Sequence, residues 1–335
     1  MIGCNMHTYY VIRNNIDIDI DIDIAMSVSM LGIIWVNCLF VKNQPIFLEM
    51  IRSFSDFRTF KKPPGYDEFN QKMNFYTKLH LIYVHIGGMS YFTIFSYFRY
   101  KKCVRINQER SLNEICLLFS NIHMPFDVNF FPAVEIIAAL QLFSSVYVYF
   151  LCGSILWTNV ELVEHLGFRM RDLKRVLLEV FKEQNLEKQR RKFGYAIRYH
   201  NELLRVGKLL DKFYGIELIL HVTLTGMTLG CCAFAMINNN SLDTLILFIG
   251  WLFAIVISCI AGQRLLDETS TLPDILYETD WYNLDVKLQK DLVLFLCRSN
   301  RPMEIKAGTI VMRSALIIQI LKTAYSCLTL LSSVK

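Results

Sequence analysis

Six stretches of the chain are each long and apolar enough to cross a bilayer, and this feature limits the possible folds more than any other. A bilayer core needs ~20 mostly apolar residues per helix. The six predicted spans are Ile24–Val41, Leu79–Phe98, Phe131–Trp157, Phe213–Ile237, Leu242–Gln263 and Gly308–Val334. We therefore predict an all-α, polytopic helical membrane protein with six spans.

Charged residues make up 19% of the chain and crowd into the segments between the predicted spans. Basic residues concentrate in Lys42–Lys78, Glu161–Lys212 and Arg264–Lys306, which alternate with segments poorer in Lys and Arg. The excess of Lys and Arg in cytoplasmic loops puts this set inside the cell. The C-terminus is then outside, as is the N-terminus of a six-span chain. Basic residues confined to connecting segments do not indicate a nucleic-acid partner.

Two segments between spans predict specific helix arrangements. Glu161–Lys212 lacks proline and repeats apolar residues at helical spacing, which favours helices that extend from the membrane into the cytoplasm. A solvated helical linker is the alternative. Only a short polar turn around Asn238–Asn240 separates the fourth and fifth spans, so these two must form an antiparallel hairpin.

The first residues differ in character from the rest. Ile16–Ile24 alternates isoleucine and aspartate, a pattern that a half-buried strand also gives, but nothing nearby could pair with it. We interpret this run as low-complexity sequence with no role in the fold, and residues 1–23 as an atypical low-complexity N-terminus. Residues 24–335 form a single predicted transmembrane domain.

Enzyme and cofactor signatures are missing from the sequence. It contains no nucleotide-binding glycine motif, no paired zinc histidines and no serine-nucleophile motif. The cysteines form no C-x-x-C pair, and most lie in apolar stretches, where they behave as small hydrophobic residues. We predict that the protein is not an enzyme and needs no metal or cofactor.

Ionisable residues inside a membrane are costly and indicate function by default. Glu135 and Glu217 lie near span ends, where solvation at the membrane interface is the favoured explanation. Lys322 instead lies in the middle of the last span, and it forms a polar stripe together with Gln319, Thr323, Ser326 and Thr329. A helix with such a stripe should face water or other subunits.

Leu330 and Val334 lie four residues apart at the end of that helix, so they share one face. On a pore-lining helix they could form a constriction that closes by dewetting. Packing against a neighbouring helix explains the spacing equally well.

Aromatic and small residues gather in the outer halves of several spans, where they could form an apolar ligand pocket or ordinary packing. They are Gly87, Gly88, Tyr91, Phe92 and Phe95 in the second span, and Phe248 and Trp251 in the fifth. In the predicted outer segments, Cys103 and Cys116 could form a disulfide, and Asn239 begins a glycosylation sequon.

The C-terminal third resembles the closing signature of insect odorant receptors, and the resemblance extends over Ile24–Lys335. The matching pieces are Tyr277–Tyr282, Arg298–Pro302, Lys306–Gly308 and Leu321–Ser326, with Met124–Asp127 and His200 earlier in the chain. The related gustatory receptors end in Thr-Tyr, five residues, then Gln-Phe. Here Ala324-Tyr325 is followed by Leu331-Ser332. This difference favours the odorant branch.

The resemblance implies a multi-pass receptor in the plasma membrane of olfactory sensory neurons. Family members form odour-gated, non-selective cation channels, as tetramers with a shared co-receptor subunit, and their last helix lines the pore. By position, Leu330 and Val334 fall at the hydrophobic gate and Ser333 at a polar pore-lining position. The family has seven spans and a cytoplasmic N-terminus, so the chain is expected to lack the family's first span.

The family also implies a pocket for a small volatile hydrophobic ligand in the outer halves of the spans. The predicted ligand-binding residues are Met26, Met30, His85, Gly88, Phe92, Phe248 and Trp251. Alternative functions are a G-protein-coupled or gustatory-type chemoreceptor, and a transporter. A G-protein-coupled receptor needs the opposite orientation, and a transporter should show duplicated halves with broken helices, which the sequence lacks.

Overall fold

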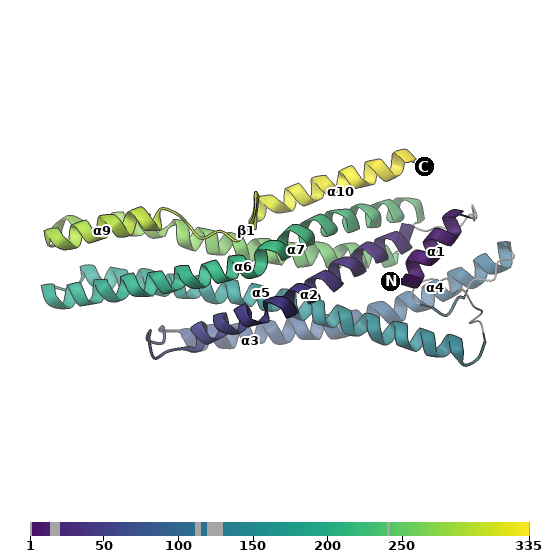
Figure 1. The fold of residues 1–335 in the computed structure, drawn as a ribbon, viewed down its shortest axis with the longest axis horizontal. Coiled ribbons are helices and arrows are strands. Elements are labelled where there is room, and N and C mark those ends of the chain that lie inside the picture. The colour runs from purple at the N-terminus through teal and green to yellow at the C-terminus, as the bar shows by residue number, and fades with distance from the viewer. Residues whose placement is uncertain (1, 14–20, 111–114, 119–129, 240–241, 335) are drawn as a thin grey trace.

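The computed structural model describes residues 2–13, 21–110, 115–118, 130–239 and 242–334. It is built almost wholly of helices (Figure 1). In chain order they are α1 (Ile2–Arg13), α2 (Asp21–Ser55), α3 (Tyr66–Ile82), the π-helix η1 (Tyr83–Gly87), α4 (Gly88–Arg110), α5 (Ala133–Phe181), α6 (Leu186–Asn239), α7 (Leu242–Ser270), α8 (Leu272–Tyr277), the 3-10 helix η2 (Trp281–Asn283), α9 (Val286–Ser299) and α10 (Ser314–Val334). Two short strands, β1 (Lys306–Ala307) and β2 (Ile310–Val311), pair antiparallel before α10.

The helices form one elongated bundle with two different ends (Figure 1). One end carries the connection between α5 and α6 together with α8 and α9, and the other carries α1 and the C-terminus. Among the described residues, six helices are long and apolar enough to cross a membrane. The prediction of a six-span helical membrane protein is therefore confirmed.

The predicted helices outside the membrane are present as extensions of two spans. α5 has 49 residues and α6 has 54, and both continue far beyond the ~20 residues that a bilayer requires. Their extensions carry fully buried leucines, among them Leu166, Leu173, Leu177 and Leu210. The extensions therefore share a hydrophobic core with α8 and α9, because apolar side chains outside lipid must be buried against protein.

Ion pairs tie these extensions to their neighbours. Lys174 on α5 lies 2.7 Å from Glu268 on α7, and the Arg264 guanidinium on α7 lies 2.8 Å from Glu164 on α5. Buried His200 on α6 packs its ring 4.7 Å from the ring of Phe295 on α9. The charged loops of the sequence are thus organised helical structure.

The last span begins later than predicted. Residues from Gly308 to Arg313 belong to the hairpin and its exit, and α10 starts at Ser314. Gly308 has a φ of 62°, which an L-residue with a side chain rarely adopts, so the chain turns there. The Ser314 amide donates to Gln263 Oε1 at 3.2 Å, which satisfies one of the free amides at the helix start.

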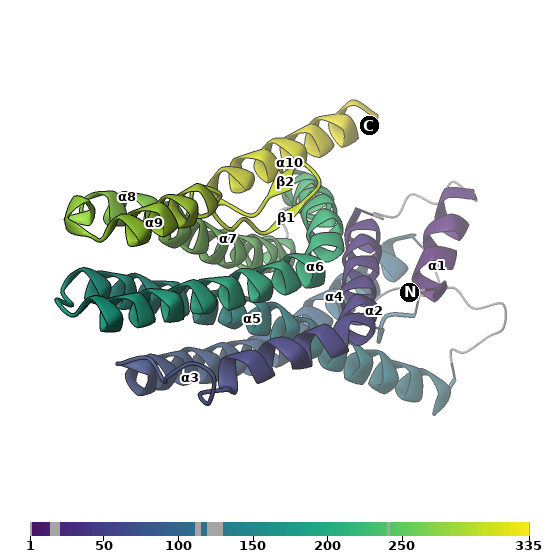
Figure 2. The same cartoon turned by 60° about the vertical axis from the view of Figure 1, so that its left-hand side comes forward.

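α6 is the central helix of the membrane region, and α10 lies at its edge. The apolar window of the α6 span is 61% buried, whereas that of α10 is 17% buried. Figure 2 shows α10 at the upper edge of the bundle. Two glycines of α6 permit its contact with α10: a Cβ on Gly226 would lie 3.0 Å from Thr323 Cγ2, and one on Gly230 would lie 2.6 Å from Cys327 Cβ.

The central position of α6 explains why the interpretation of Glu217 was wrong. Glu217 is 2% exposed, and its Oε1 accepts a hydrogen bond from Asn159 Nδ2 at 3.3 Å. Helices surround α6 on several sides, so even a residue near its span end faces protein instead of the membrane interface. Glu135, by contrast, lies exposed in the first turn of α5.

The predicted disulfide is present and joins Cys103 and Cys116. The glycosylation sequon and the Met124–Asp127 piece fall partly or wholly outside the described residues. So do residues 14–20 of the N-terminal region. Asp21–Ile24 form the first turn of α2, and Ile24 packs against Cys231 and Cys232, so this part of the Ile-Asp run does contribute to the fold.

Candidate functional site: an apolar cavity between the spans

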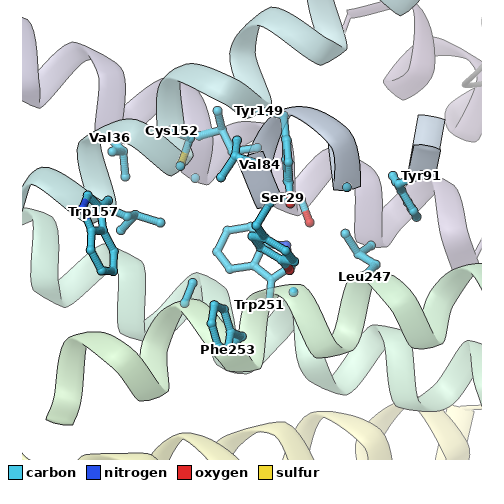
Figure 3. A pocket seen from close by; sticks show the side chains of 18 of the residues that line it. Ser29, Val36, Val84, Tyr91, Tyr149, Cys152, Trp157, Leu247, Trp251 and Phe253 are labelled. Atoms are coloured by element: carbon cyan, nitrogen blue, oxygen red, sulfur yellow. The ribbon is translucent and has the colours of Figure 1, made fainter. Parts of the chain in front are cut away.

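A cavity of about 220 Å³ lies between α2, α3, η1, α4, α5, α6 and α7. Its walls are mostly apolar, and aromatic side chains enter it from several helices (Figure 3). The lining residues used below are Ser29, Met30, Val36, His80, Tyr83, Val84, Phe92, Tyr149, Gly153, Trp157, His221, Leu224, Gly250, Trp251 and Phe253. Such a concave, apolar space with few polar groups is typical of small-molecule sites.

The π-helix η1 and two glycines shape one wall. A π-turn inserts one residue into an α-helix and often occurs at functional sites. Here it directs Tyr83 and Val84 into the cavity. A Cβ on Gly153 would lie 2.9 Å from Val84 Cγ2, and one on Gly88 would lie 2.9 Å from Tyr149 Cδ1. Only glycine permits this close approach of α5 to η1 and α4.

One end of the cavity is held by hydrogen bonds. The His80 ring stacks on Trp157 with ring centres 4.9 Å apart, and its Nε2–H donates to the Gly153 carbonyl at 3.0 Å. Trp157 Nε1 donates to Thr77 Oγ1 at 2.7 Å. His80 Nε2 and Trp157 Nε1 are therefore paired with protein oxygens, and the ring faces remain for a ligand.

Aromatic contacts continue along the other walls. Tyr83 and Phe253 lie with ring centres 5.6 Å apart, and the Phe92 ring meets Tyr149 edge-on at 6.0 Å. The Trp251 ring lies edge-on to His221 at 6.1 Å. Ring pairs in these arrangements hold each other in place.

Some buried polar atoms of the cavity lining have no hydrogen-bond partner among the described residues, and two of these atoms are used below. They are Ser29 Oγ, from a side chain that is 4% exposed, and His221 Nε2, from one that is 8% exposed. Ser258, which also lines the cavity, donates to the Ala254 carbonyl at 3.0 Å. Within the described residues, no group of His, Cys, Asp and Glu could hold a metal ion.

The structure brings only part of the predicted ligand-binding set to this cavity. Met30, Phe92 and Trp251 line it, whereas His85, Gly88 and Phe248 are not among its lining residues. The Met26 side chain lies outside the described residues.

The π-helix explains why His85 does not line this cavity. The extra residue in the turn rotates the helix, so His85 is exposed. Its ring lies tilted against that of Phe150 with centres 4.1 Å apart, and its Nδ1–H donates to the Leu81 carbonyl at 2.8 Å. Phe248 packs into neighbouring core clusters.

Tyr83, Val84, Trp157 and His221 line the cavity but are missing from the predicted set. A sequence window cannot locate a π-turn, so the first two had no signal. His221 did have one, because it is an ionisable residue within a predicted span.

The predicted pore residues lie on α10, away from the cavity. Leu330 is 64% exposed, and Ser333 Oγ donates to the Leu330 carbonyl at 2.8 Å. The Val334 side chain lies outside the described residues. With helical turns of about 100° per residue, Gln319, Ser326 and Leu330 fall within about 40° of one another, and all three are exposed.

Solved structures that are close to this chain in fold include an insect olfactory receptor in two forms. The insect olfactory receptor OR5 from Machilis hrabei in complex with eugenol superposes with a TM-score of 0.78, over 99% of this chain and 87% of that one, at 13% identity. A second structure of Machilis hrabei OR5 superposes with a TM-score of 0.75, over 100% of this chain and 86% of that one, at 12% identity. At this identity the likeness concerns the fold.

Curated relatives by sequence include odorant receptor 85c of Drosophila melanogaster, 25% identical over 44% of this chain, and odorant receptor 49a of the same fly, 24% identical over 51%. Odorant receptor Or2 of Anopheles gambiae is 25% identical over 42%. The matches span 38, 44 and 38% of those three relatives, less than half of their lengths.

The family model described as "7tm Odorant receptor" matches residues 25–325, which is most of the chain and includes every cavity-lining residue. Helical fold, spans, C-terminal signature and family match agree, and the chain belongs to the odorant receptor family of insects.

Proposed function

We propose that this chain is the odorant-binding subunit of an odour-gated, non-selective cation channel that assembles as a heterotetramer with a co-receptor. The ligand is a small volatile hydrophobic molecule that enters the cavity between the spans. The observation that carries the proposal is the cavity of about 220 Å³, walled by apolar and aromatic side chains, in a chain of this family. The related Machilis receptor is described in complex with eugenol, a small organic molecule.

The central helix α6 connects the cavity with the proposed pore helix. Leu224 lines the cavity, and Gly226, two residues further along, packs against Thr323 of α10. A ligand that shifts α6 therefore changes the surface on which α10 rests. In this account Leu330 and Val334 form the hydrophobic gate, and Ser333 faces the conduction path.

The exposed face of α10 supports a position against other subunits or water. Lys322 lies mid-helix and is exposed, as are Gln319 and Ser326. A charged side chain in the middle of a span is expensive against lipid tails, so it should face a water-filled space or a partner. The C-terminus lies on the extracellular side of the plasma membrane of olfactory neurons in this proposal, with the α5–α6 extensions in the cytoplasm.

The proposal is tested by filling the cavity. A Cβ on Gly250 meets no atom within 4 Å, and Gly250 lines the cavity, so Gly250→Leu adds volume there without a clash at its first atom. Cells that express the chain and a co-receptor are screened for odorant-evoked calcium entry. For odorants that activate the wild type, we expect Gly250→Leu to raise the half-maximal concentration on the order of tenfold or more.

Gly194→Leu is the matched control. Gly194 lies in the α6 extension, and its Cβ position is equally free of atoms within 4 Å. This variant should respond like the wild type. Equal responses from Gly250→Leu and the wild type would contradict the assignment of the cavity as the ligand site.

A further inference from the structure

His221 is the polar side chain of the cavity wall whose ring nitrogen cannot be satisfied by its own helix. It is 8% exposed, lines the cavity from α6, and its Nε2 has no hydrogen-bond partner within the part of the chain that the structure describes. A buried polar atom without a partner costs ~1–3 kcal/mol. Something that enters the cavity can remove that cost.

Ser29 Oγ is also without a partner, but its situation differs. A serine hydroxyl in a helix can rotate to the carbonyl four residues earlier, as Ser96, Ser154 and Ser258 do here at 2.7 to 3.0 Å. The Ser29 hydroxyl can rotate in the same way to a backbone carbonyl of its own helix. The Nε2 atom of histidine lies at the far end of a rigid ring, so it cannot turn back to its own backbone in this way.

Neighbouring helices close around His221 and leave it facing the cavity. The Trp251 ring lies edge-on to the imidazole at 6.1 Å. One turn along α6 from His221, Leu224 meets α2, where a Cβ on Gly32 would lie 3.1 Å from Leu224 Cδ1. One turn in the other direction, Glu217 is hydrogen-bonded to Asn159 and is not among the lining residues.

We propose that the cavity selects small molecules with one hydroxyl group on an apolar body, alcohols or phenols, and that His221 Nε2 binds this hydroxyl. A hydroxyl both donates and accepts, so it pairs with Nε2 in either tautomer of a neutral imidazole. A hydrocarbon leaves Nε2 unpaired. A carboxylate or ammonium pays a large desolvation cost, because the lining residues include no Asp, Glu, Lys or Arg. The inference rests on the proposed function, in which this cavity is the ligand site.

The test compares an alcohol with the hydrocarbon of the same carbon number. The full-length chain is purified into lipid nanodiscs, and 1-heptanol or heptane displaces the fluorescent probe 1-aminoanthracene. His221→Phe keeps a flat ring but loses the ring nitrogen, and His221→Gln keeps a hydrogen-bonding amide. We expect His221→Phe to weaken 1-heptanol on the order of tenfold and to leave heptane unchanged, while His221→Gln retains most of the alcohol affinity.

1-Heptanol and heptane partition differently into lipid. Because all variants are compared in the same nanodiscs, this difference cancels. Val36→Ala is the control, because Val36 is a buried apolar lining residue. Its truncation should change the affinities of 1-heptanol and heptane by the same factor. The proposal is overturned if His221→Phe changes the affinities of 1-heptanol and heptane equally, or changes neither affinity. It is also overturned if 1-heptanol fails to displace 1-aminoanthracene from the wild type.

If His221→Phe does not fold, His221→Gln and His221→Leu give the same comparison. Gly250→Leu separates this proposal from the proposed function. Gly250→Leu could weaken the binding of both 1-heptanol and heptane while His221→Phe affects the two equally. In that case the cavity is the binding site, and the proposed role of His221 is wrong. If Gly250→Leu changes the affinity of neither 1-heptanol nor heptane, the cavity is not the binding site and both proposals are wrong.

Discussion

At the scale of single residues, the surroundings of a buried polar side chain indicate whether its role is structural or ligand binding. His200, Glu217 and His221 are all nearly inaccessible, yet their surroundings differ. Glu217 has Asn159 as a hydrogen-bond donor, His200 packs against Phe295 on α9, and His221 faces the cavity. The residue type alone does not distinguish structural from binding roles, because each role depends on what the side chain touches.

His200 predicts a pH dependence of stability. Burial, and then the charge of Arg298, lower the pKa of His200 from 6.5 to about 4. Since the folded pKa is below the unfolded one, stability is full above about pH 6.5 and falls as the pH drops toward 4. The loss is on the order of 3 kcal/mol.

Melting temperatures of wild type and His200→Phe between pH 7.5 and 4.5 measure this effect. We expect the wild type to lose more stability than the variant as the pH falls below 6.5. Parallel pH profiles of the two proteins would contradict the burial of a neutral His200.

Leu330 and Val334 predict a change in conduction. Truncating a hydrophobic constriction favours its hydration, so Leu330→Ala or Val334→Ala should raise basal current or alter ion selectivity in cells that also express the co-receptor. Leu321→Ala is the control, because Leu321 lies about 180° from Leu330 around α10. Unchanged basal current and selectivity in both gate variants would count against a pore role for this end of the helix.

At the scale of elements, α6 organises the membrane region because glycines let α10 approach it. A Cβ on Gly230 would lie 2.8 Å from the Ala324 carbonyl oxygen as well as too close to Cys327. Backbone cannot yield as a flexible side chain does. The contact between these two helices therefore depends on the lack of a side chain at Gly230.

Gly230→Ala should displace α10 and lower the melting temperature by several degrees, in spite of the better helix propensity of alanine. Gly194→Ala, in the same helix but with free space at its Cβ, should be neutral or slightly stabilising. Thermal unfolding of both purified variants makes the comparison. A Gly230→Ala variant as stable as Gly194→Ala would show that α6 and α10 are not in close contact.

The sequence predicted the location of the helices better than it predicted which side of each helix faces the cavity. Span length and hydropathy located all six spans, because a bilayer imposes both on any crossing helix. The start of α10 was missed because the apolar residues before Ser314 belong to a short hairpin that turns at Gly308. His85 lies outside the cavity lining because the π-helix changes the register of its span, and a periodicity argument does not include that extra residue.

At the scale of the whole molecule, the bundle has a membrane part and a part with a conventional core. Fully buried leucines concentrate in the extensions of α5 and α6, whereas most span windows are less than a third buried. That division fits helices that meet lipid or partner subunits along one half and water along the other. The fold alone does not set the orientation, which follows from the charges.

Basic residues in the α5–α6 extensions predict that this end lies in the cytoplasm. An epitope at the C-terminus should therefore be labelled by antibody on intact cells. An epitope in the connection between α5 and α6 should be labelled only after permeabilisation. Labelling of the C-terminal epitope only in permeabilised cells would contradict the channel topology and favour a G-protein-coupled receptor.

The central claim is that ligand binding in the cavity opens a channel to which this chain itself contributes. The most direct measurement is the odorant-evoked current in outside-out patches from cells that express the chain and a co-receptor, with no nucleotides in the pipette. We expect an immediate current that reverses near 0 mV with sodium outside and potassium inside, and that Gly250→Leu makes less sensitive to the odorant. A response that requires GTP, or one that Gly250→Leu leaves unchanged, would contradict this account.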